Sequence, residues 1–437
     1  MGKRIALFSP DIKDFREWFV LTGLLKEILG TGNEVTVFSK EGGDSTVAYH
    51  EFSWRNLKNP FDLIVYNFSG GEDSAYMAPF LLSNPGMVII RDMSFGENLW
   101  RMHTLDGSEQ DFINEMVYCY GKSGILLGNL MWRGLWGEQL ERKFPLLKIA
   151  AHGSLSVCGF DPWLIDRTAK ESVFGEIKLL PSPYIYYPSE KTSPASILTF
   201  YTDDYPLLID KAVSASRELM SLGTDFRLTV ITDGRNREKT EKLLENQGLM
   251  SIAQVVIPAD PAELDSIILK SSIMLFIEDP AAPVEYLPAV AAASASCAVV
   301  LTDSLTRLSF PDSAFPKFRF SGKTESLFGI IKNLLTNQDS LIKYGNGARK
   351  FFFGDPPKQN GKETKSVNPA FVKTLEAAVS EAMTTAGSFR YPIGYPEHLY
   401  NYDKRLLASM KEKLDGFPVS EEIERTLESV IGPSTKK

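Results

Sequence analysis

Short apolar runs of strand length recur along this chain, and most are followed by a turn and a segment of helical periodicity. The first such run, residues 5–8, leads into an amphipathic stretch over 16–29, and a second run follows at 34–38. Runs without an alternating polar face are typical of parallel strands buried on both sides. The first 38 residues therefore predict a β-α-β unit, and its repetition predicts an open parallel sheet.

The first half of the chain predicts one Rossmann-like domain over residues 1–185. Its pattern changes over about 97–148, where helical spacing and many aromatic residues predict a helical insertion. We expect these aromatics to pack on the sheet, the alternative being a stacking platform for a ligand. Residues 181–194 combine four prolines with three tyrosines, which indicates a linker. The further strands are expected at residues 62–66, 88–90, 154–157 and 177–180.

After this linker the α/β rhythm restarts and predicts a second Rossmann-like domain over residues 195–350. A C-terminal helical tail is expected over 366–437. Two such domains present the carboxyl ends of two sheets to each other, so we predict an α/β protein with a cleft between its lobes. The second domain's strands are expected at residues 196–200, 227–232, 254–257, 273–277 and 297–301.

Composition narrows the class of protein. The 437 residues carry a net charge of −8, which disfavours a nucleic-acid partner because such binding needs clustered cations. Three cysteines and four scattered histidines predict neither a disulfide framework nor a metal site. No apolar stretch reaches the length of a transmembrane helix. These features predict a cytoplasmic protein and leave contact with a membrane surface open.

Several segments, taken in order, resemble one family. The chain is similar to glycosyltransferases of the GT-B type, family 4 in particular, over roughly residues 3–350. The resemblance implies transfer of a sugar from a nucleotide sugar, UDP- or GDP-linked, to a hydroxyl of a saccharide or glycan acceptor. It also implies retention of configuration, with no metal and no cofactor. It is carried by residues 3–10, 33–38, 61–67, 84–92, 112–121, 144–147, 261–264, Pro280 and 299–303.

The family's donor-site motifs are degenerate here. Residues 9–15 lack the glycines that let backbone amides approach a phosphate. Arg91-Asp92 stands where relatives have His-Asp, and an arginine can hold a phosphate or a carboxylate. Asp203 and Asp204 follow the strand after which relatives place a cationic clamp. Two uncompensated carboxylates at this place would repel a diphosphate.

The last donor segment departs from the family in the same way. Pro283-Val284 replaces a Gly-Glu pair, and residues 296–298 replace Gly-x-Pro. Glu278 and Glu285 lie close enough in sequence to present a carboxylate through a shifted turn.

Seven residues are the candidate site. The alternative, purely structural roles are a local ion pair for Arg91-Asp92, a simple turn for Asp233-Gly234 and a helix start for Glu285. The candidate catalytic residues are Asp92 and Glu285, and the candidate donor-binding residues are Arg91, Asp233, Gly234, Arg235 and Glu278.

Two functions remain open from the sequence. The first is a glycosyltransferase with replaced phosphate ligands. The second is a catalytically inactive protein that keeps the two-lobed fold to bind a ligand or to partner an active transferase.

Overall fold

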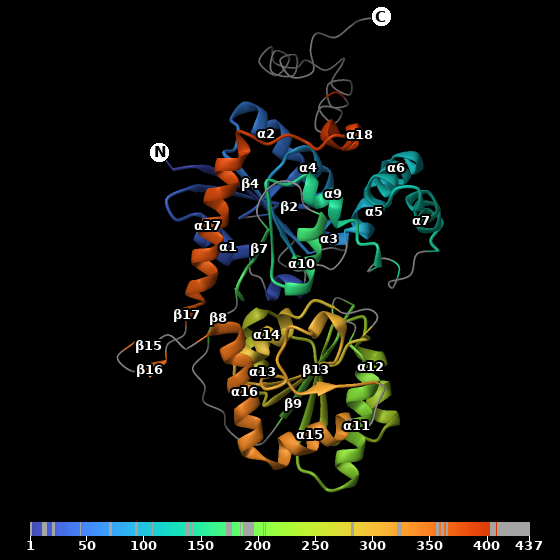
Figure 1. Ribbon diagram of the computed structural model, residues 1–437. Helices are drawn as coiled ribbons and strands as arrows, with labels where there is room; N and C mark the ends of the chain where they lie inside the picture. Colours follow the sequence, from blue (N-terminus) through green and yellow to red (C-terminus); the bar gives the residue numbers. More distant parts are fainter. Residues whose placement is uncertain are drawn as a thin grey trace, which may run out of the picture.

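The computed structural model shows two α/β lobes stacked along one axis (Figure 1). Each lobe contains one parallel sheet, as predicted. The structure describes residues 2–402 and 408 apart from 11–14, 20–21, 44, 70–71, 92–94, 107, 136–139, 141–142, 172–176, 184, 187–195, 204, 206, 281–283, 321–325, 355–357, 360–361, 364–365 and 403–407.

The sheet of the first lobe has seven parallel strands in the order β3-β2-β1-β4-β5-β6-β7. The short β3 was not predicted, because two residues carry no periodicity to read. The strands are β1 (Arg4–Phe8), β2 (Glu34–Ser39), β3 (Val47–Ala48), β4 (Leu63–Phe68), β5 (Met87–Ile90), β6 (Ser156–Gly159) and β7 (Ile177–Leu179).

Helices cover both faces of this sheet, so alternate residues of each central strand are buried on opposite sides. In β1, Ile5 and Leu7 face α1 (Thr22–Leu29) and α17 (Pro369–Ala386), whereas Ala6 and Phe8 face α2 (Phe52–Lys58) and α4 (Ala78–Ser83). The expected helix over 16–29 begins as a 3-10 turn, η1 (Phe15–Trp18), before α1. The other helices are η2 (Tyr49–Glu51), α1 (Thr22–Leu29), α2 (Phe52–Lys58), α3 (Glu72–Ala75), α4 (Ala78–Ser83), α9 (Leu147–His152) and α10 (Pro162–Glu171).

The predicted insertion is helical and extends to one side of the first lobe (Figure 1). It comprises α5 (Gly96–Asp106), α6 (Glu109–Tyr120) and α7 (Ser123–Trp132), with α6 packed against both neighbours. Phe112 is fully buried, and Trp100 and Trp132 are partly buried against the same core as the sheet. The aromatics therefore pack as expected of a core.

The sheet of the second lobe has six parallel strands in the order β11-β10-β9-β12-β13-β14. Its strands are β9 (Ser196–Tyr201), β10 (Arg227–Thr232), β11 (Ala253–Val256), β12 (Ile273–Phe276), β13 (Ala298–Thr302) and the unpredicted two-residue β14 (Lys317–Phe318). The helices around it are α11 (Ile209–Ser221), α12 (Arg237–Asn246), α13 (Pro261–Lys270), α14 (Leu287–Ser294), η3 (Leu305–Arg307), α15 (Leu327–Thr336) and α16 (Gln338–Phe353).

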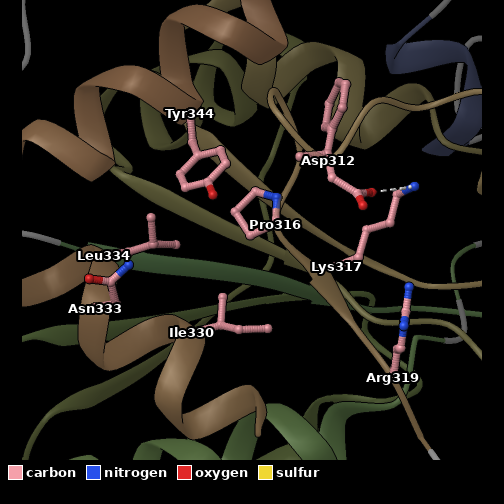
Figure 2. A pocket seen from close by; sticks show the side chains of 9 residues that line it. Asp312, Pro316, Lys317, Arg319, Ile330, Asn333, Leu334 and Tyr344 are labelled. Carbon is pink, nitrogen blue, oxygen red and sulfur yellow. Dashed lines mark ion pairs between the residues drawn. The ribbon is translucent and has the colours of Figure 1, made fainter. Parts of the chain in front are cut away.

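A cavity of about 260 Å³ lies beside β14, at the edge of this sheet (Figure 2). Its cations are already paired, because Lys317 lies 2.9 Å from Asp312 and Arg319 pairs with Asp303. The Lys317 ammonium holds the pKa of Asp312 below its usual value. Both cations that line the cavity are therefore paired with carboxylates of the described residues.

The tail crosses back onto the first lobe. Helix α17 (Pro369–Ala386) packs on α1 and on strands β4 to β6, and α18 (Glu397–Tyr400) packs on α4. On the way, β17 (Ser366–Val367) pairs antiparallel with β8 (Ile185–Tyr186), and β15 (Lys358–Gln359) pairs with β16 (Lys362–Glu363). Among the described residues, no helix combines the length and the apolarity that crossing a membrane would need. The helices predicted beyond residue 403 lie outside the described residues.

Candidate functional site between the two lobes

On the first lobe, a buried polar network lies at the carboxyl ends of β1, β4 and β5. The Glu17 carboxylate is its centre: it accepts hydrogen bonds from Asn67 at 3.0 Å and Thr22 at 2.6 Å, and it forms an ion pair with Arg91. Ser9 contacts both Thr22 and Asn67. All five side chains are buried. These strand ends therefore meet in one charge-compensated cluster.

This network determines whether Arg91, of the predicted pair Arg91-Asp92, can contact a ligand. The Arg91 guanidinium is buried against Glu17, which lies 74 residues earlier in the chain. Its charge is neutralised within the protein, so the arginine is not a free cation for a phosphate. Asp92 lies outside the described residues.

On the second lobe, the carboxylate of Glu278 lies just beyond the end of β12. Its Oε2 accepts from the Val284 backbone N–H at 2.9 Å, and its backbone exchanges two hydrogen bonds with the Thr302 side chain, both at 2.9 Å. Glu278 is buried, with 1% of its surface exposed. The side chain is therefore fixed between the ends of β12 and β13.

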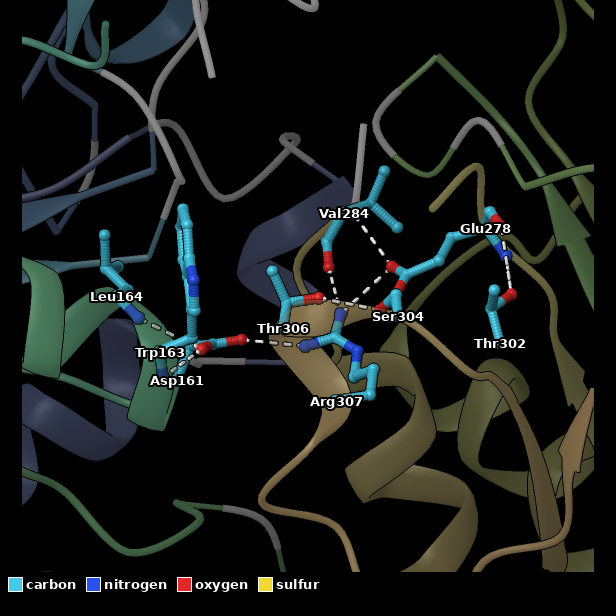
Figure 3. Close-up of polar contacts among 9 residues, drawn as sticks. All are labelled: Asp161, Trp163, Leu164, Glu278, Val284, Thr302, Ser304, Thr306 and Arg307. Atoms are coloured by element: carbon cyan, nitrogen blue, oxygen red, sulfur yellow. Dashed lines mark hydrogen bonds and ion pairs between the residues drawn. The ribbon is translucent and has the colours of Figure 1, made fainter. Parts of the chain in front are cut away.

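Arg307 joins the two lobes through a buried ion triad (Figure 3). Its Nη2 donates to Glu278 at 3.0 Å and to the Val284 carbonyl at 2.6 Å, while its Nη1 donates to Asp161 of the first lobe at 2.9 Å. Asp161 also caps α10, accepting from the Trp163 backbone N–H at 2.8 Å. One guanidinium therefore serves two carboxylates, which leaves the triad with one excess negative charge.

Glu278 binds a proton more readily than an exposed carboxyl group does. Burial raises the pKa of Glu278 above its usual value, and Arg307 opposes this rise only in part. A buried carboxyl group with a raised pKa at the edge of a sheet is a functional-site candidate.

Replacing Glu278 with glutamine should change how stability depends on pH. In the wild type the folded carboxyl binds its proton above the unfolded pKa, so stability falls as pH rises from about 4.5 through the raised pKa. Each unit of the rise corresponds to about 1.4 kcal/mol. Chemical unfolding of both proteins between acid and neutral pH measures this. The Glu278→Gln variant should lose that fall, and parallel pH profiles would contradict the assignment.

Asp233, Gly234 and Arg235 form the predicted turn after β10, next to the segment after β9. The Arg235 Nη1 lies 2.9 Å from the Asp203 carboxylate, and the Asp233 carboxylate accepts the Asp203 backbone N–H at 3.2 Å. Burial alone would raise the pKa of Asp233, but backbone hydrogen bonds and Arg235 hold it below its usual value. A Cβ at Gly234 would meet no atom of the described residues within 4 Å. The turn is therefore open on that side.

A second cation, Lys239 of α12, lies at the same place. Its ammonium is 5.1 Å from the centre of the Tyr201 ring, and interaction with Tyr201 and then Asp203 raises the pKa of Lys239. The expectation of uncompensated carboxylates after β9 is therefore wrong for Asp203, because Arg235, in the turn after the neighbouring strand β10, pairs with it, and Lys239 of α12 adds a second positive charge that interacts with it. Asp204 lies outside the described residues.

Glu285 lies in the segment between β12 and α14, where the second lobe contacts the first. The side chain is partly buried, and the next residue, Tyr286, donates its hydroxyl to the Phe160 carbonyl of the first lobe. Burial raises the pKa of Tyr286 well above its usual value. Glu285 thus lies one residue from a contact between the lobes.

Aromatic side chains fill the space between the ends of β1 and β9. Phe15 and Phe19 of the first lobe pack on Phe200 and Tyr205 of the second, with ring centres 5.6 to 6.2 Å apart. All four are buried. Both lobes contribute to one continuous apolar core here.

Ser296, which stands where the family resemblance would place the glycine of Gly-x-Pro, has a backbone conformation that glycine favours. Its φ is 54°, in the left-handed region, and the Arg349 guanidinium donates to its hydroxyl at 3.0 Å. Gly345 of α16 packs so closely that a Cβ there would lie 2.2 Å from the Ser296 carbonyl oxygen. The chain thus takes a glycine-like turn at the end of α14.

The structure brings Asp233, Gly234 and Arg235 together, and places Glu278 and Glu285 beside the lobe contact. Sequence reasoning missed three residues of this region: Asp161, Lys239 and Arg307. The Asp-Pro pair at 161–162 is a recognisable helix start, but nothing local marks the partner of Arg307, which is 146 residues away.

Comparisons with known proteins identify the fold. No protein-family model matches the sequence, and no curated protein matches it. Among solved structures, the chain is similar to the sucrose-phosphate synthase of Thermosynechococcus elongatus, with 12% identity over 88% of this chain and 98% of that one and a TM-score of 0.54. Anabaena HepE, solved with UDP-glucose, matches with 10% identity over 89% and 100% of the chains and a TM-score of 0.55. WaaG, a glycosyltransferase of lipopolysaccharide biosynthesis, matches with 14% identity over 86% and 98% and a TM-score of 0.50.

At these identities the likeness establishes the fold alone. The chain has the GT-B fold of glycosyltransferases, with two parallel-sheet α/β lobes and a tail that returns to the first lobe.

Proposed function

We propose that this protein transfers a sugar from a nucleotide sugar to an acceptor hydroxyl, with the donor held by the second lobe. The observation that carries the proposal is the pair of cations, Arg235 and Lys239, beside the segment after β9 in a chain of GT-B fold. This is the edge of an open α/β sheet at which ligands bind. As the family resemblance implies, we propose retention of configuration and no metal in the transfer step.

The cations suit a leaving diphosphate. Arg235 is 71% exposed and its partner Asp203 is 53% exposed, and such exposed pairs are weak, so the guanidinium can exchange Asp203 for a phosphate. Charge-assisted hydrogen bonds from Arg235 and Lys239 would stabilise the negative charge that develops on the leaving group. Asp233 and Gly234 complete this donor side.

We propose that the carboxylates of the site serve the donor sugar and the acceptor hydroxyl. Glu278 and Glu285 come from the segment that relatives of this kind use for the donor sugar; Glu285 is proposed to meet the sugar, and Glu278, buried against Arg307, to hold this segment in place. Asp92 is proposed to contact the acceptor hydroxyl. Arg91, paired with Glu17, would orient this edge of the first lobe rather than meet the phosphate directly.

UDP-glucose should stabilise the purified protein through Arg235 and Lys239. At a ligand concentration of about 100 times Kd, the unfolding free energy should rise by about 2.7 kcal/mol, read as a higher melting temperature. The Arg235→Ala/Lys239→Ala variant should lose the stabilisation. Arg237→Ala is the matched control, because Arg237 pairs with Glu241 along α12 at 2.8 Å.

The donor proposal fails if UDP- and GDP-linked sugars produce neither a melting shift nor donor hydrolysis. It also fails if the double variant responds as the wild type does, since the donor would then lie elsewhere.

A second candidate is a catalytically inactive protein of this fold that binds a ligand or partners an active transferase. The observation in its favour is that Arg91 and Arg307 are buried in ion pairs and that aromatics fill the space between β1 and β9. Turnover that disappears in Glu285→Gln would contradict this candidate. Recovery of the chain alone from its native host would count against a partner subunit.

A further inference from the structure

Three side chains from distant parts of the chain meet on the outer side of the first lobe. They are His103 at the end of α5, Glu115 in α6 and His398 in α18. The Glu115 Oε1 lies 2.6 Å from the His103 Nε2 and 2.8 Å from the His398 Nε2. All three ligand atoms lie within 4.8 Å of one another. No spacing pattern in the sequence indicates this cluster, because its histidines are 295 positions apart, at 103 and 398.

The charge of this cluster is unusual for a protein interior. Glu115 is fully buried, and its Oε2 has no hydrogen-bond partner among the described residues. Within the same part of the chain, neither Lys nor Arg forms an ion pair with it. A second carboxylate, Asp111, lies 3.6 Å from the His398 Nδ1. A buried carboxylate needs a compensating cation or hydrogen bonds, and one of its oxygens has neither.

We propose that His103, Glu115 and His398 bind a divalent transition metal, Zn²⁺ in the first place. Two imidazoles and one carboxylate are a zinc ligand set of the kind that leaves a fourth position open. Ligand atoms around tetrahedral zinc are about 3.3 Å apart, so the two hydrogen-bonded contacts, now 2.6 and 2.8 Å, must open by about 0.5 to 0.7 Å to admit the ion. The free Oε2 of Glu115 supplies a further lone pair for this adjustment.

The surroundings fit a metal centre. Asp111 faces the second ring nitrogen of His398, the arrangement in which a carboxylate orients a metal-bound histidine. A cavity of about 380 Å³ adjoins the cluster and is lined by His103, Asp111 and His398 themselves. It has room for water as the fourth ligand. Softer ligands that would favour copper(I) are not in the set.

The proposed metal would fasten the returning tail to the helical insertion. Helix α18 has four residues and rests on α4, whereas His398 reaches across to α5 and α6. The site belongs to the first lobe, whereas the cations proposed to bind the diphosphate belong to the second. The proposed metal site therefore does not depend on the proposed transfer reaction.

Metal binding by the full-length protein tests the proposal. After removal of metal with a chelator, titration with ZnCl₂ should show one equivalent bound and a rise in melting temperature. Glu115→Gln and His398→Ala should each weaken binding at least a hundredfold and abolish the thermal shift. Asp111→Asn should weaken it about tenfold to a hundredfold, as expected for a residue that orients a ligand. Co²⁺ in place of Zn²⁺ should give the visible absorption of a low-coordinate site.

His50→Ala is the matched control, because His50 lies outside the cluster, and it should bind zinc as the wild type does. Absence of zinc binding by the wild type overturns the proposal. So does unchanged binding in both Glu115→Gln and Asp111→Asn, two substitutions that preserve side-chain shape and keep the test valid if His398→Ala does not fold.

Discussion

Arg307→Met is expected to lower the free energy of unfolding by about 3–5 kcal/mol, because it leaves Asp161 and Glu278 buried without their shared cation. Methionine retains an apolar stem of similar length, so the loss reports mainly on charge. The guanidinium also lies 5.1 Å from the centre of the Tyr286 ring, a contact that disappears with it. Chemical unfolding at neutral pH measures the difference.

Arg237→Met is the control for loss of an arginine. Its ion pair with Glu241 is exposed, and such pairs are worth about 0–1 kcal/mol. An equal effect of the two substitutions would contradict the role assigned to Arg307.

Neutralising the whole triad separates charge from packing. If Arg307→Met acts by stranding buried carboxylates, adding Asp161→Asn and Glu278→Gln should recover much of the lost stability, since neutral residues often replace a buried ion group at little cost. Loss of packing alone would not be recovered. The coupling should exceed about 1 kcal/mol, because the three side chains are in direct contact.

The fold was predictable because the central strands are mostly apolar and buried along most of their length. In β4 all six residues are buried, so hydrophobicity alone located it in the sequence. Strands β3 and β14, with two residues each, are held by backbone pairing to a neighbour and carry no pattern of their own. The sequence pattern thus located the strands and helices whose side chains are periodic, and it missed the short strands that are held only by backbone pairing to a neighbour.

The candidate site was predictable only where its residues follow a strand. Asp233 to Arg235 could be located because a Gly-containing turn comes directly after β10. Arg91 was located but not its partner, because Glu17 approaches from the turn before α1. Contacts between lobes, such as Arg307 with Asp161, depend on how the two sheets face each other. No local sequence pattern encodes how the two lobes are placed relative to each other.

The aromatic contact between the lobes leads to the second large effect. Phe19→Ala should cost about 3–5 kcal/mol, the usual loss for a buried phenylalanine. Phe19 is 2% exposed, and its ring lies 6.0 Å from that of Phe200 and 5.6 Å from that of Tyr205, both in the second lobe. Because these rings belong to a core shared by both lobes, their loss should also reduce the coupling between the lobes.

Differential scanning calorimetry distinguishes these two consequences. The wild type should unfold in one main transition, whereas Phe19→Ala should show two transitions as the lobes unfold separately. Phe52→Ala is the matched control: Phe52 is fully buried but packs only within the first lobe, on Phe8 and Phe38. It should cost a similar free energy without separating the lobes as Phe19→Ala does. If both variants behave alike, the aromatic contact does not couple the lobes.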